Sequence, residues 1–322
     1  MSAVALPLRP GLQSGALRPY ALPALRPVAY PAHDGDLVLV VNANASGVRR
    51  NPGIVSQAAF ALRAAGGQVE LRVTESAAEL AAVAADPDRR LVLLGGDGTM
   101  HALANLPGAQ AEAALLPVGG ANNIANSLGI PTDLYAAAEL AVNGRARAID
   151  AIEARSATRT VVVVEGISVG FHALARARYS AVNSTDVRAA VGAGFSAIRA
   201  FHPVPVALEL DGEAELSPLG QLFAANLPLY GPRLAVAPDA DPADGLIDVV
   251  RIATRGRLDT IAALASLRRG HDPKGIERRR ARRIRIVTGG RSPVIADTLD
   301  LGTGPVDLTI RPAALRIVAP PA

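Results

Sequence analysis

Apolar and polar positions alternate in a regular way through residues 37–147. Four short apolar-rich segments have the length and composition of buried strands, and the segments between them have the longer, mixed pattern of helices. Strands that alternate with helices indicate a parallel sheet with helices on both faces. The pattern therefore predicts a doubly wound α/β domain over residues 37–147, with strands at Leu37–Val41, Val69–Val73, Leu91–Leu94 and Ala114–Pro117.

The pattern changes after about Ala148, where strand-like segments follow one another with few helices between them. Turn signals such as Asp211-Gly212 separate these segments. We expect a β-rich, sandwich-like second domain over residues 148–310, and we expect residues 311–322 to pack back on the first domain. The predicted strands are Ile149–Arg155, Thr160–Glu165, Val204–Leu210, Gln221–Asn226, Ile247–Ile252, Ile284–Val287 and Val306–Ile310.

Residues 1–36 carry many Pro, Ala, Arg and Gly residues without a clear period. Such a composition predicts a disordered extension. A weak membrane-touching arm at Leu17–Arg26 is the alternative, because Leu and Arg alternate loosely there.

Composition limits the possible classes of protein. The 322 residues fit about two domains, and half of them are hydrophobic, with a mean hydropathy of +0.25. The chain has no cysteine, which excludes disulfides and thiolate metal sites. No unbroken apolar run reaches the ~18 residues of a membrane span, and the first residues lack the pattern of a secretion signal. We expect a cytoplasmic protein that can associate peripherally with a membrane.

The basic residues are nearly all arginine, and Lys274 is the single lysine. A P-loop requires a lysine inside its glycine motif, so a Walker-type kinase is excluded. Any binding of phosphate must therefore use backbone N–H groups, arginine and a metal ion. The histidines His101, His202 and His271 lack metal-ligand spacing, and we predict that they are structural.

The segment Leu91–Thr99, LVLLGGDGT, joins a predicted strand to a glycine-rich turn and a helix. Open α/β sheets bind ligands at this position. Glycines allow the backbone to approach phosphate oxygens, and a helix N-terminus offers unpaired N–H groups. Asp97 in this turn would repel a bare phosphate, so it indicates a Mg²⁺ ligand or a proton acceptor. An ordinary strand–turn–helix connection with an Asx turn is the alternative.

A second segment of the same kind is Leu115–Pro131, LLPVGGANNIANSLGIP. It also leads from a predicted strand through two glycines into a helix, which contains Asn122 and Asn123. Because the two strands are neighbours in the predicted sheet, both glycine turns should face one crevice. A plain helix N-cap at Asn122 is compatible with this role.

Together with Asn42, these two segments resemble the catalytic domain of diacylglycerol and sphingosine kinases, most closely the bacterial lipid kinases of that family. The resemblance continues in order through EGISVGFHA (165–173), AANLPLYG (224–231), APDADPADGLIDVV (237–250) and PAALR (312–316). It implies a phosphofructokinase- or NAD-kinase-like first domain, a cleft that holds ATP between two domains, and transfer of phosphate to a lipid hydroxyl in phospholipid biosynthesis. Folds of this family often pair, so a homodimer is one expectation.

The resemblance also implies roles for individual residues. Asp97 and Asp297 would face the terminal phosphate of ATP–Mg²⁺ as catalytic carboxylates. A cation loop would use Asp241, Asp244 and Leu246. Contacts to the nucleotide would come from Asn42, Thr74, Gly95, Gly96, Asp97, Gly98, Thr99, Gly119, Gly120 and Asn122.

The chain departs from the family at several of these positions. The family carries Thr, Asp and Glu where this chain has Gly120, Asn123 and Leu299, and often Asp where it has His172. A missing general base costs about 10²–10⁴-fold in rate. A nucleotide- or lipid-binding homologue with impaired catalysis therefore stays open, as does another GGDGT-type kinase that acts on NAD or a small alcohol. A second Asp-Gly-Glu, Asp211–Glu213, lies too early in the chain and predicts a surface hairpin turn.

The strongest basic cluster is RRRARRIR at 278–285. It predicts either contact with anionic lipid, at about 1 kcal/mol per basic residue near the surface, or a solvated helix end before the next strand. Nucleic acid is not an expected partner, because few aromatic residues accompany the cluster.

The acceptor lipid stays open among diacylglycerol, phosphatidylglycerol, a sphingoid base and a carotenoid- or polyketide-like alcohol.

Overall fold

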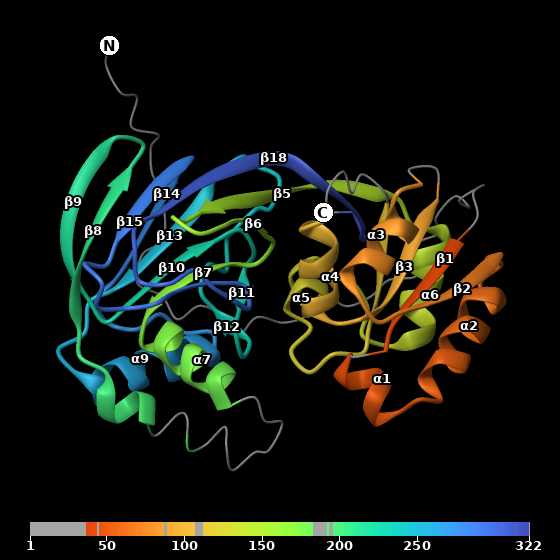
Figure 1. The fold of residues 1–322 in the computed structure, drawn as a ribbon, viewed down its shortest axis with the longest axis horizontal. Coiled ribbons are helices and arrows are strands. Elements are labelled where there is room, and N and C mark those ends of the chain that lie inside the picture. Colours follow the sequence, from red (N-terminus) through yellow and green to blue (C-terminus); the bar gives the residue numbers. More distant parts are fainter. Residues whose placement is uncertain are drawn as a thin grey trace.

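The computed structural model describes residues 37–43, 45–86, 89–106, 112–182, 192 and 196–321. The predicted disordered extension, residues 1–36, lies outside these ranges, as does the alternative arm at residues 17–26. Figure 1 shows two lobes side by side, an α/β lobe and a β-rich lobe, joined by long strands.

The α/β lobe is built on a parallel sheet with the strand order β2-β1-β3-β4. The chain moves in opposite directions from β1, first to β2 and then back to β3, so right-handed connections place helices on both faces. The strands are β1 (Leu37–Asn42), β2 (Val69–Thr74), β3 (Arg90–Gly95) and β4 (Ala113–Pro117). The predicted doubly wound sheet is confirmed.

The helices of this lobe begin where the sequence supplies a cap or a glycine turn. The side chain of Ser76 accepts a hydrogen bond from Glu79 N at the start of α3, and Asp133 accepts one from Ala136 N at the start of α6. The helices are α1 (Ser46–Arg50), α2 (Ile54–Ala64), α3 (Ala77–Ala84), α4 (Asp97–Ala104), α5 (Asn123–Ser127) and α6 (Leu134–Asn143).

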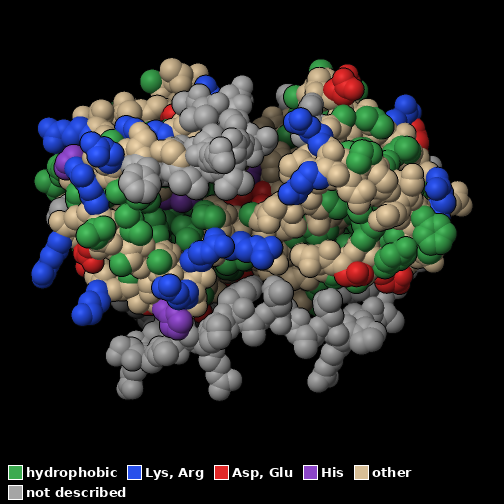
Figure 2. All heavy atoms as spheres, turned by 90° about the horizontal axis from the view of Figure 1, so that it is seen from below, with side chains coloured by type: hydrophobic (Ala, Val, Ile, Leu, Met, Phe, Trp, Pro, Cys, Tyr) green, Lys and Arg blue, Asp and Glu red, His purple; other side chains and the backbone are tan. Residues whose placement is uncertain are grey.

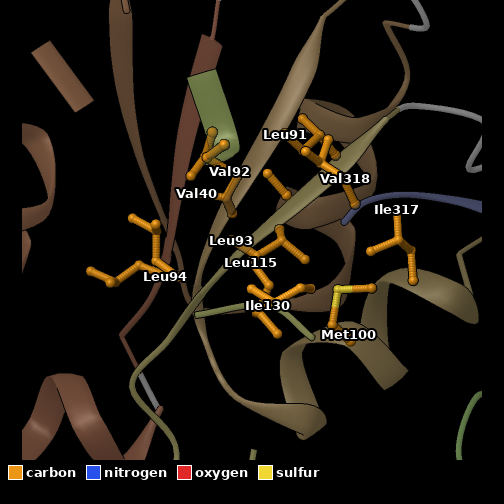
Figure 3. Packing of buried hydrophobic residues seen from close by; sticks show 14 of the residues in the cluster. Val40, Leu91, Val92, Leu93, Leu94, Met100, Leu115, Ile130, Ile317 and Val318 are labelled. Atoms are coloured by element: carbon orange, nitrogen blue, oxygen red, sulfur yellow. The ribbon is translucent and has the colours of Figure 1, made fainter. Parts of the chain in front are cut away.

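The core of the α/β lobe consists of the fully buried strand residues and the helix faces that cover them. Figure 3 shows Leu91, Leu93 and Met100 packed close to Ile317 and Val318 from the end of the chain. The last strand, β18 (Val306–Val318), therefore supplies core residues to the first lobe, where Ile317 pairs with Ala113 of β4.

The β-rich lobe contains two sheets that pack face to face. The first sheet continues from the α/β lobe through β18, and its other members here are β5 (Ala146–Arg155), β6 (Thr160–Val163), β8 (Val204–Leu210), β9 (Glu213–Leu219) and β15 (Arg283–Val287). The second has the order β14-β13-β10-β7-β16-β17, with β7 (Gly166–Gly170), β10 (Gln221–Ala225), β13 (Ile247–Ile252), β14 (Ile276–Ala281), β16 (Val294–Ala296) and β17 (Leu299–Asp300). Buried residues of both sheets form one core between them, so the predicted sandwich-like lobe is confirmed.

The outer face of the second sheet is covered by helices. A smaller apolar cluster joins Phe223 and Ile252 of this sheet to Ala263 and Leu267 of α9. The helices are α7 (Phe171–Val182) and α9 (Arg257–Arg268), and a short hairpin is formed by β11 (Leu229–Tyr230) and β12 (Leu234–Ala235). Figure 1 places both helices below the sheets of this lobe.

A hairpin turn and an arginine-rich segment of the second lobe test two of the sequence predictions. Asp211 and Gly212 form the predicted hairpin turn between β8 and β9, both with positive φ, and the Asp211 carboxylate accepts hydrogen bonds from the backbone N–H groups of Arg282 and Arg283. The arginine-rich segment 278–285 belongs to strands β14 and β15, so the predicted helix end there is wrong. The strands tolerate arginine because alternate side chains point away from the core.

Candidate active site between the two lobes

The two glycine-rich turns lie side by side at the carboxyl edge of the parallel sheet. Gly95, at the end of β3, is in register with Pro117 at the end of β4, and Val118 N donates a 2.8 Å hydrogen bond to Gly95 O. A Cβ atom added to Gly96 would lie 2.9 Å from the Cα of Gly119, which real side chains do not allow. Glycine is therefore required at this contact, which brings the two turns together as the sequence predicts.

The other glycines of the turns face open space. A Cβ atom added to Gly98 or Gly120 would meet no atom within 4 Å, and both residues are exposed. Thr99, in contrast, is buried, and its hydroxyl oxygen would lie 2.3 Å from a Cβ on Gly95. The turns thus combine an inner part fixed by packing with an outer part that a ligand can reach.

Asp97 ties the two turns together. Its two carboxylate oxygens accept hydrogen bonds from Asn123 N at 3.1 Å and from Ile124 N at 3.0 Å, the first residues of α5. Asn122, just before them, adopts a left-handed conformation with φ 51°, and its side-chain amide donates to Gly119 O at 3.1 Å. The Asp97 side chain is only partly buried, so its charge also acts on the open side of the turns.

The remaining residues predicted to contact nucleotide lie at the same edge of the sheet. Asn42 and Thr74 end β1 and β2 and are in register with each other, and Ala43 N donates to Thr74 O at 3.1 Å. The edge lies where the strand order reverses around β1, the position at which open α/β sheets bind ligands. Figure 2 shows a furrow between the two lobes, with acidic, histidine and basic side chains along it.

Asp297 is placed across from this edge, in the second lobe, and is buried. It has a left-handed conformation with φ 49°, and its carboxylate accepts hydrogen bonds from Val164 N, Glu165 N and Gly166 N at 2.8–3.1 Å. Three backbone donors at the connection between β6 and β7 therefore hold the Asp297 carboxylate in place. Leu299, at the position of the family glutamate, lies in the short strand β17.

The structure adds a buried group that the sequence did not predict. His101 Nε2 lies 3.0 Å from Glu165 Oε1 and 3.4 Å from Asp297 Oδ2. His101 follows the GGDGT motif on α4, and Glu165 directly precedes β7, so the group joins the two lobes. Local spacing of histidines does not reveal this group, because its residues are far apart in the chain.

Burial and the neighbouring charges shift the pKa values of this group. Burial opposes the charged form of His101, but the carboxylates of Asp297, Glu165 and Asp97 outweigh it and raise the pKa of His101 to about 9. Burial raises the pKa of Glu165 to about 7, against the opposing effect of His101. Asn123 stabilises the arrangement, because its side-chain amide donates to Glu165 Oε2 at 2.7 Å.

The predicted cation loop is ordered by its own hydrogen bonds. Asp241 O accepts from Asp244 N at 3.3 Å, and Asp244 Oδ1 accepts from Leu246 N at 3.0 Å. The second oxygen of Asp244 lies 3.4 Å from the Arg280 guanidinium, which also bonds Asp248 at 3.0 Å. Arg280 therefore competes with a metal ion for this loop, and the site at Asp241, Asp244 and Leu246 stays a prediction.

Comparison with protein-family models gives two matches that follow each other along the chain. Residues 36–154 match the diacylglycerol kinase catalytic domain, and residues 165–319 match the YegS C-terminal NAD kinase beta sandwich-like domain. Residues 36–154 therefore form a domain of the diacylglycerol kinase catalytic-domain family. The resemblance inferred from the glycine motifs is confirmed, and the glycine turns and Asp97 lie within the catalytic-domain match.

Two bacterial relatives show how far the similarity to known members of this family extends. The chain is 27% identical over 251 residues to a diacylglycerol kinase of Mycobacterium tuberculosis, which covers 75% of this chain and 80% of the relative. It is 24% identical over 284 residues to a protein of Shewanella frigidimarina named probable lipid kinase YegS-like, covering 83% and 89%. Both lobes thus have counterparts in these proteins.

Solved structures show the same fold. A crystal structure of a diacylglycerol kinase from Bacillus anthracis strain Sterne superposes with a TM-score of 0.66 at 17% identity, over 89% of this chain and 97% of that one. Within the described part of this chain, each helix is too short or too polar to cross a lipid bilayer.

Proposed function

We propose that this protein is an ATP-dependent lipid kinase that phosphorylates a hydroxyl group of diacylglycerol or a closely related lipid. The observation that carries the proposal is the contact between Gly96 and Gly119, with Gly98 and Gly120 open beside it. This arrangement is a cradle without side chains at the carboxyl edge of a parallel sheet, which suits the phosphates of a nucleotide. The names of the relatives support a lipid as the acceptor.

Backbone N–H groups of the glycine turns and of the start of α4 would hold the phosphates, since the first N–H groups of a helix have no partner within it. Asn42 and Thr74 adjoin this cradle at the ends of β1 and β2. Mg²⁺, when bound with ATP, would neutralise phosphate charge. Phosphoryl transfer depends mostly on positioning and charge neutralisation, so a site without lysine is sufficient.

The two predicted catalytic carboxylates receive different roles in this proposal. Asp97 is partly accessible beside the open glycines, and we assign it to the metal or to the proton of the acceptor hydroxyl. Asp297 is enclosed by three backbone donors, so it acts as a positioning residue that fixes Glu165 and the connection to β7. The acceptor would approach from the β-rich lobe.

A transfer assay with labelled ATP tests the proposal. The acceptors are vesicles that contain diacylglycerol, phosphatidylglycerol or a sphingoid base, with NAD as a soluble acceptor. We expect label in diacylglycerol, and a loss of about 10²–10⁴-fold for Asp97→Asn. The matched control is Asp150→Asn, since Asp150 is a buried carboxylate that also accepts two backbone N–H groups, from Gly245 and Ala313, away from the turns. Equal rates for the parent and Asp97→Asn would contradict the catalytic role.

A second candidate function is binding of nucleotide and lipid without transfer of phosphate. The observation in its favour is the pair of departures at Leu299 and Asn123, which replace carboxylates of the family. It predicts that the parent binds both ATP and lipid vesicles while label stays in the nucleotide. Label in NAD alone would favour the other GGDGT-type kinase instead.

A further inference from the structure

A buried cluster of three potential ligand atoms joins the two lobes behind the glycine turns. His101 Nε2, Glu165 Oε1 and Asp297 Oδ2 all lie within 4.8 Å of one another. The three residues are 6%, 4% and 9% exposed, so bulk water does not solvate them. They come from α4, from the connection between β6 and β7, and from the end of β16.

The two distances from His101 have values that also occur between ligands of one metal ion. Ligand atoms about 2.1 Å from a common ion lie about 3.0 Å apart in octahedral geometry and about 3.4 Å apart in tetrahedral geometry. His101 Nε2 is 3.0 Å from Glu165 Oε1 and 3.4 Å from Asp297 Oδ2. Yet neither ring nitrogen of His101 makes a well-directed hydrogen bond to the described residues. A buried nitrogen thus lies within ion-pair distance of two carboxylate oxygens, with poor hydrogen-bond direction to both.

The surroundings hold the two carboxylates in this orientation. Asn123 Nδ2 donates a hydrogen bond to Glu165 Oε2, so that Oε1 faces the cluster. Three backbone N–H groups orient Asp297, of which one, Val164 N, bonds the oxygen that faces His101. Hydrogen bonds that orient the carboxylates in this way are typical of carboxylates that bind metal ions.

The cluster places two buried carboxylates beside a single imidazole. Two carboxylates share one imidazole, and the Asp97 charge also acts on the group. In the part of the chain that the structure describes, no arginine or lysine forms an ion pair with Glu165 or Asp297. Buried carboxylates need a positively charged partner, and a divalent ion would serve both of them at once.

We infer that His101, Glu165 and Asp297 form a site for a divalent transition-metal ion, with Zn²⁺ or Mn²⁺ as its occupant. The imidazole ligand favours these ions over Mg²⁺, which prefers oxygen ligands and keeps several waters. Because His101 belongs to the α/β lobe and the carboxylates to the β-rich lobe, the ion cross-links the lobes. This site is separate from the Mg²⁺ of the nucleotide and from the loop at Asp241–Leu246, and it stands whether or not the protein is a kinase.

Metal binding is measured directly on the full chain. Protein treated with a chelator and dialysed is titrated with Zn²⁺, Mn²⁺ and Mg²⁺ by calorimetry, and its metal content is determined by mass spectrometry. We expect one equivalent of Zn²⁺ or Mn²⁺ to bind the parent and to raise its melting temperature. Glu165→Gln should weaken this binding by about 100-fold or more, and Asn123→Ala by about 10–100-fold.

Controls separate the site from other carboxylates. Asp150→Asn should bind the ion as the parent does, because Asp150 lies elsewhere in the core, where its carboxylate accepts from Gly245 N and Ala313 N. If Glu165→Gln does not fold, Co²⁺ bound to the parent provides the second measurement, since its d–d absorption reports nitrogen and oxygen ligands. A parent that binds none of the transition ions, or a Zn²⁺ affinity that Glu165→Gln leaves unchanged, overturns the inference.

Discussion

The side-chain amide of Asn123 donates a 2.7 Å hydrogen bond to Glu165 Oε2, and thereby fastens the helix after the second glycine turn to the other lobe. The same amide donates to Gly231 O at 2.7 Å. Two acceptors of the β-rich lobe thus depend on one residue of the α/β lobe. The position of the second glycine turn relative to the β-rich lobe is set by this amide.

Replacement of Asn123 by alanine should lower the free energy of unfolding. Both acceptors would lose their donor in a buried place, which costs about 1–3 kcal/mol for each unsatisfied group. Urea unfolding followed by circular dichroism measures this loss. Asn143→Ala is the control, because the Asn143 side chain bonds Glu139 at an exposed position and makes only a long, 3.4 Å hydrogen bond to Ala65 O, so its loss should cost less than about 1 kcal/mol. Equal losses for the two variants would contradict the role of Asn123.

Alanine substitutions at Gly96 and Gly98 should have different effects on the free energy of unfolding. Gly96→Ala places a methyl group 2.9 Å from the Cα of Gly119 and should destabilise by about 1–3 kcal/mol. Gly98 lies inside α4 with open space around it, so Gly98→Ala should leave stability unchanged or raise it by up to about 1 kcal/mol. If the open face holds phosphate, Gly98→Ala should nevertheless weaken ATP binding in calorimetry. Full ATP affinity in Gly98→Ala would place the nucleotide elsewhere.

His172 should make the stability of the protein depend on pH. Its Nδ1 lies 3.0 Å from Ser168 Oγ, and burial together with the charge of Arg176 lowers the pKa of His172 to about 4. Because the unfolded chain binds a proton near pH 6.5 and the folded chain does not, this contribution is present above pH 6.5 and is lost as the pH falls toward 4.

The expected size of this effect is about 1 kcal/mol between pH 7 and pH 5, since part of the side chain remains accessible to water. Unfolding in urea at both pH values measures the effect, and His172→Gln should reduce the difference between them. An identical pH dependence in the parent and the variant would show that another group titrates.

Arg280 should stabilise the acidic loop at Asp241–Leu246 through its ion pairs. It bonds the buried Asp248 at 3.0 Å and lies 3.4 Å from Asp244, so Arg280→Gln leaves two carboxylates without their cation. We expect a loss of about 1–3 kcal/mol in thermal or urea unfolding. Added Ca²⁺ or Mg²⁺ should restore part of this stability in the variant, because the loop then offers an unbalanced carboxylate.

Arg279→Gln is the matched control on the same strand. Arg279 is half exposed and lies 3.5 Å from Glu215, so its removal should cost less than about 1 kcal/mol. Divalent ions should not stabilise this variant beyond the parent. If they stabilise Arg279→Gln as much as Arg280→Gln, Arg280 does not compete for the loop.

The sequence predicted the α/β lobe well because its strands are short apolar runs. Leu91–Leu94 and Ala114–Pro117 are buried on both faces, as parallel strands must be, and each leads into glycines that mark the site. Strands β7 and β14 were not predicted. Gly166 and Gly170 at the ends of β7 have the composition of a turn, and β14 carries three consecutive arginines, which break the alternation that predicts a strand.

The candidate site was predicted only as far as local motifs reach. The glycine turns and Asp97 follow from contiguous segments. The group of His101, Glu165 and Asp297 does not, because Asp297 reaches the backbone of Glu165 across 132 residues of sequence. No periodicity links residues that meet only through tertiary packing, so the structure is needed to bring them together.

The placement of β18 has a consequence for how this protein is made. Ile317 and Val318 complete the core of the α/β lobe, although they are among the last residues of the chain. During synthesis the first lobe must therefore wait, partly assembled, until β18 has left the ribosome. A stop codon shortly before residue 317 would damage the lobe farthest from it in sequence.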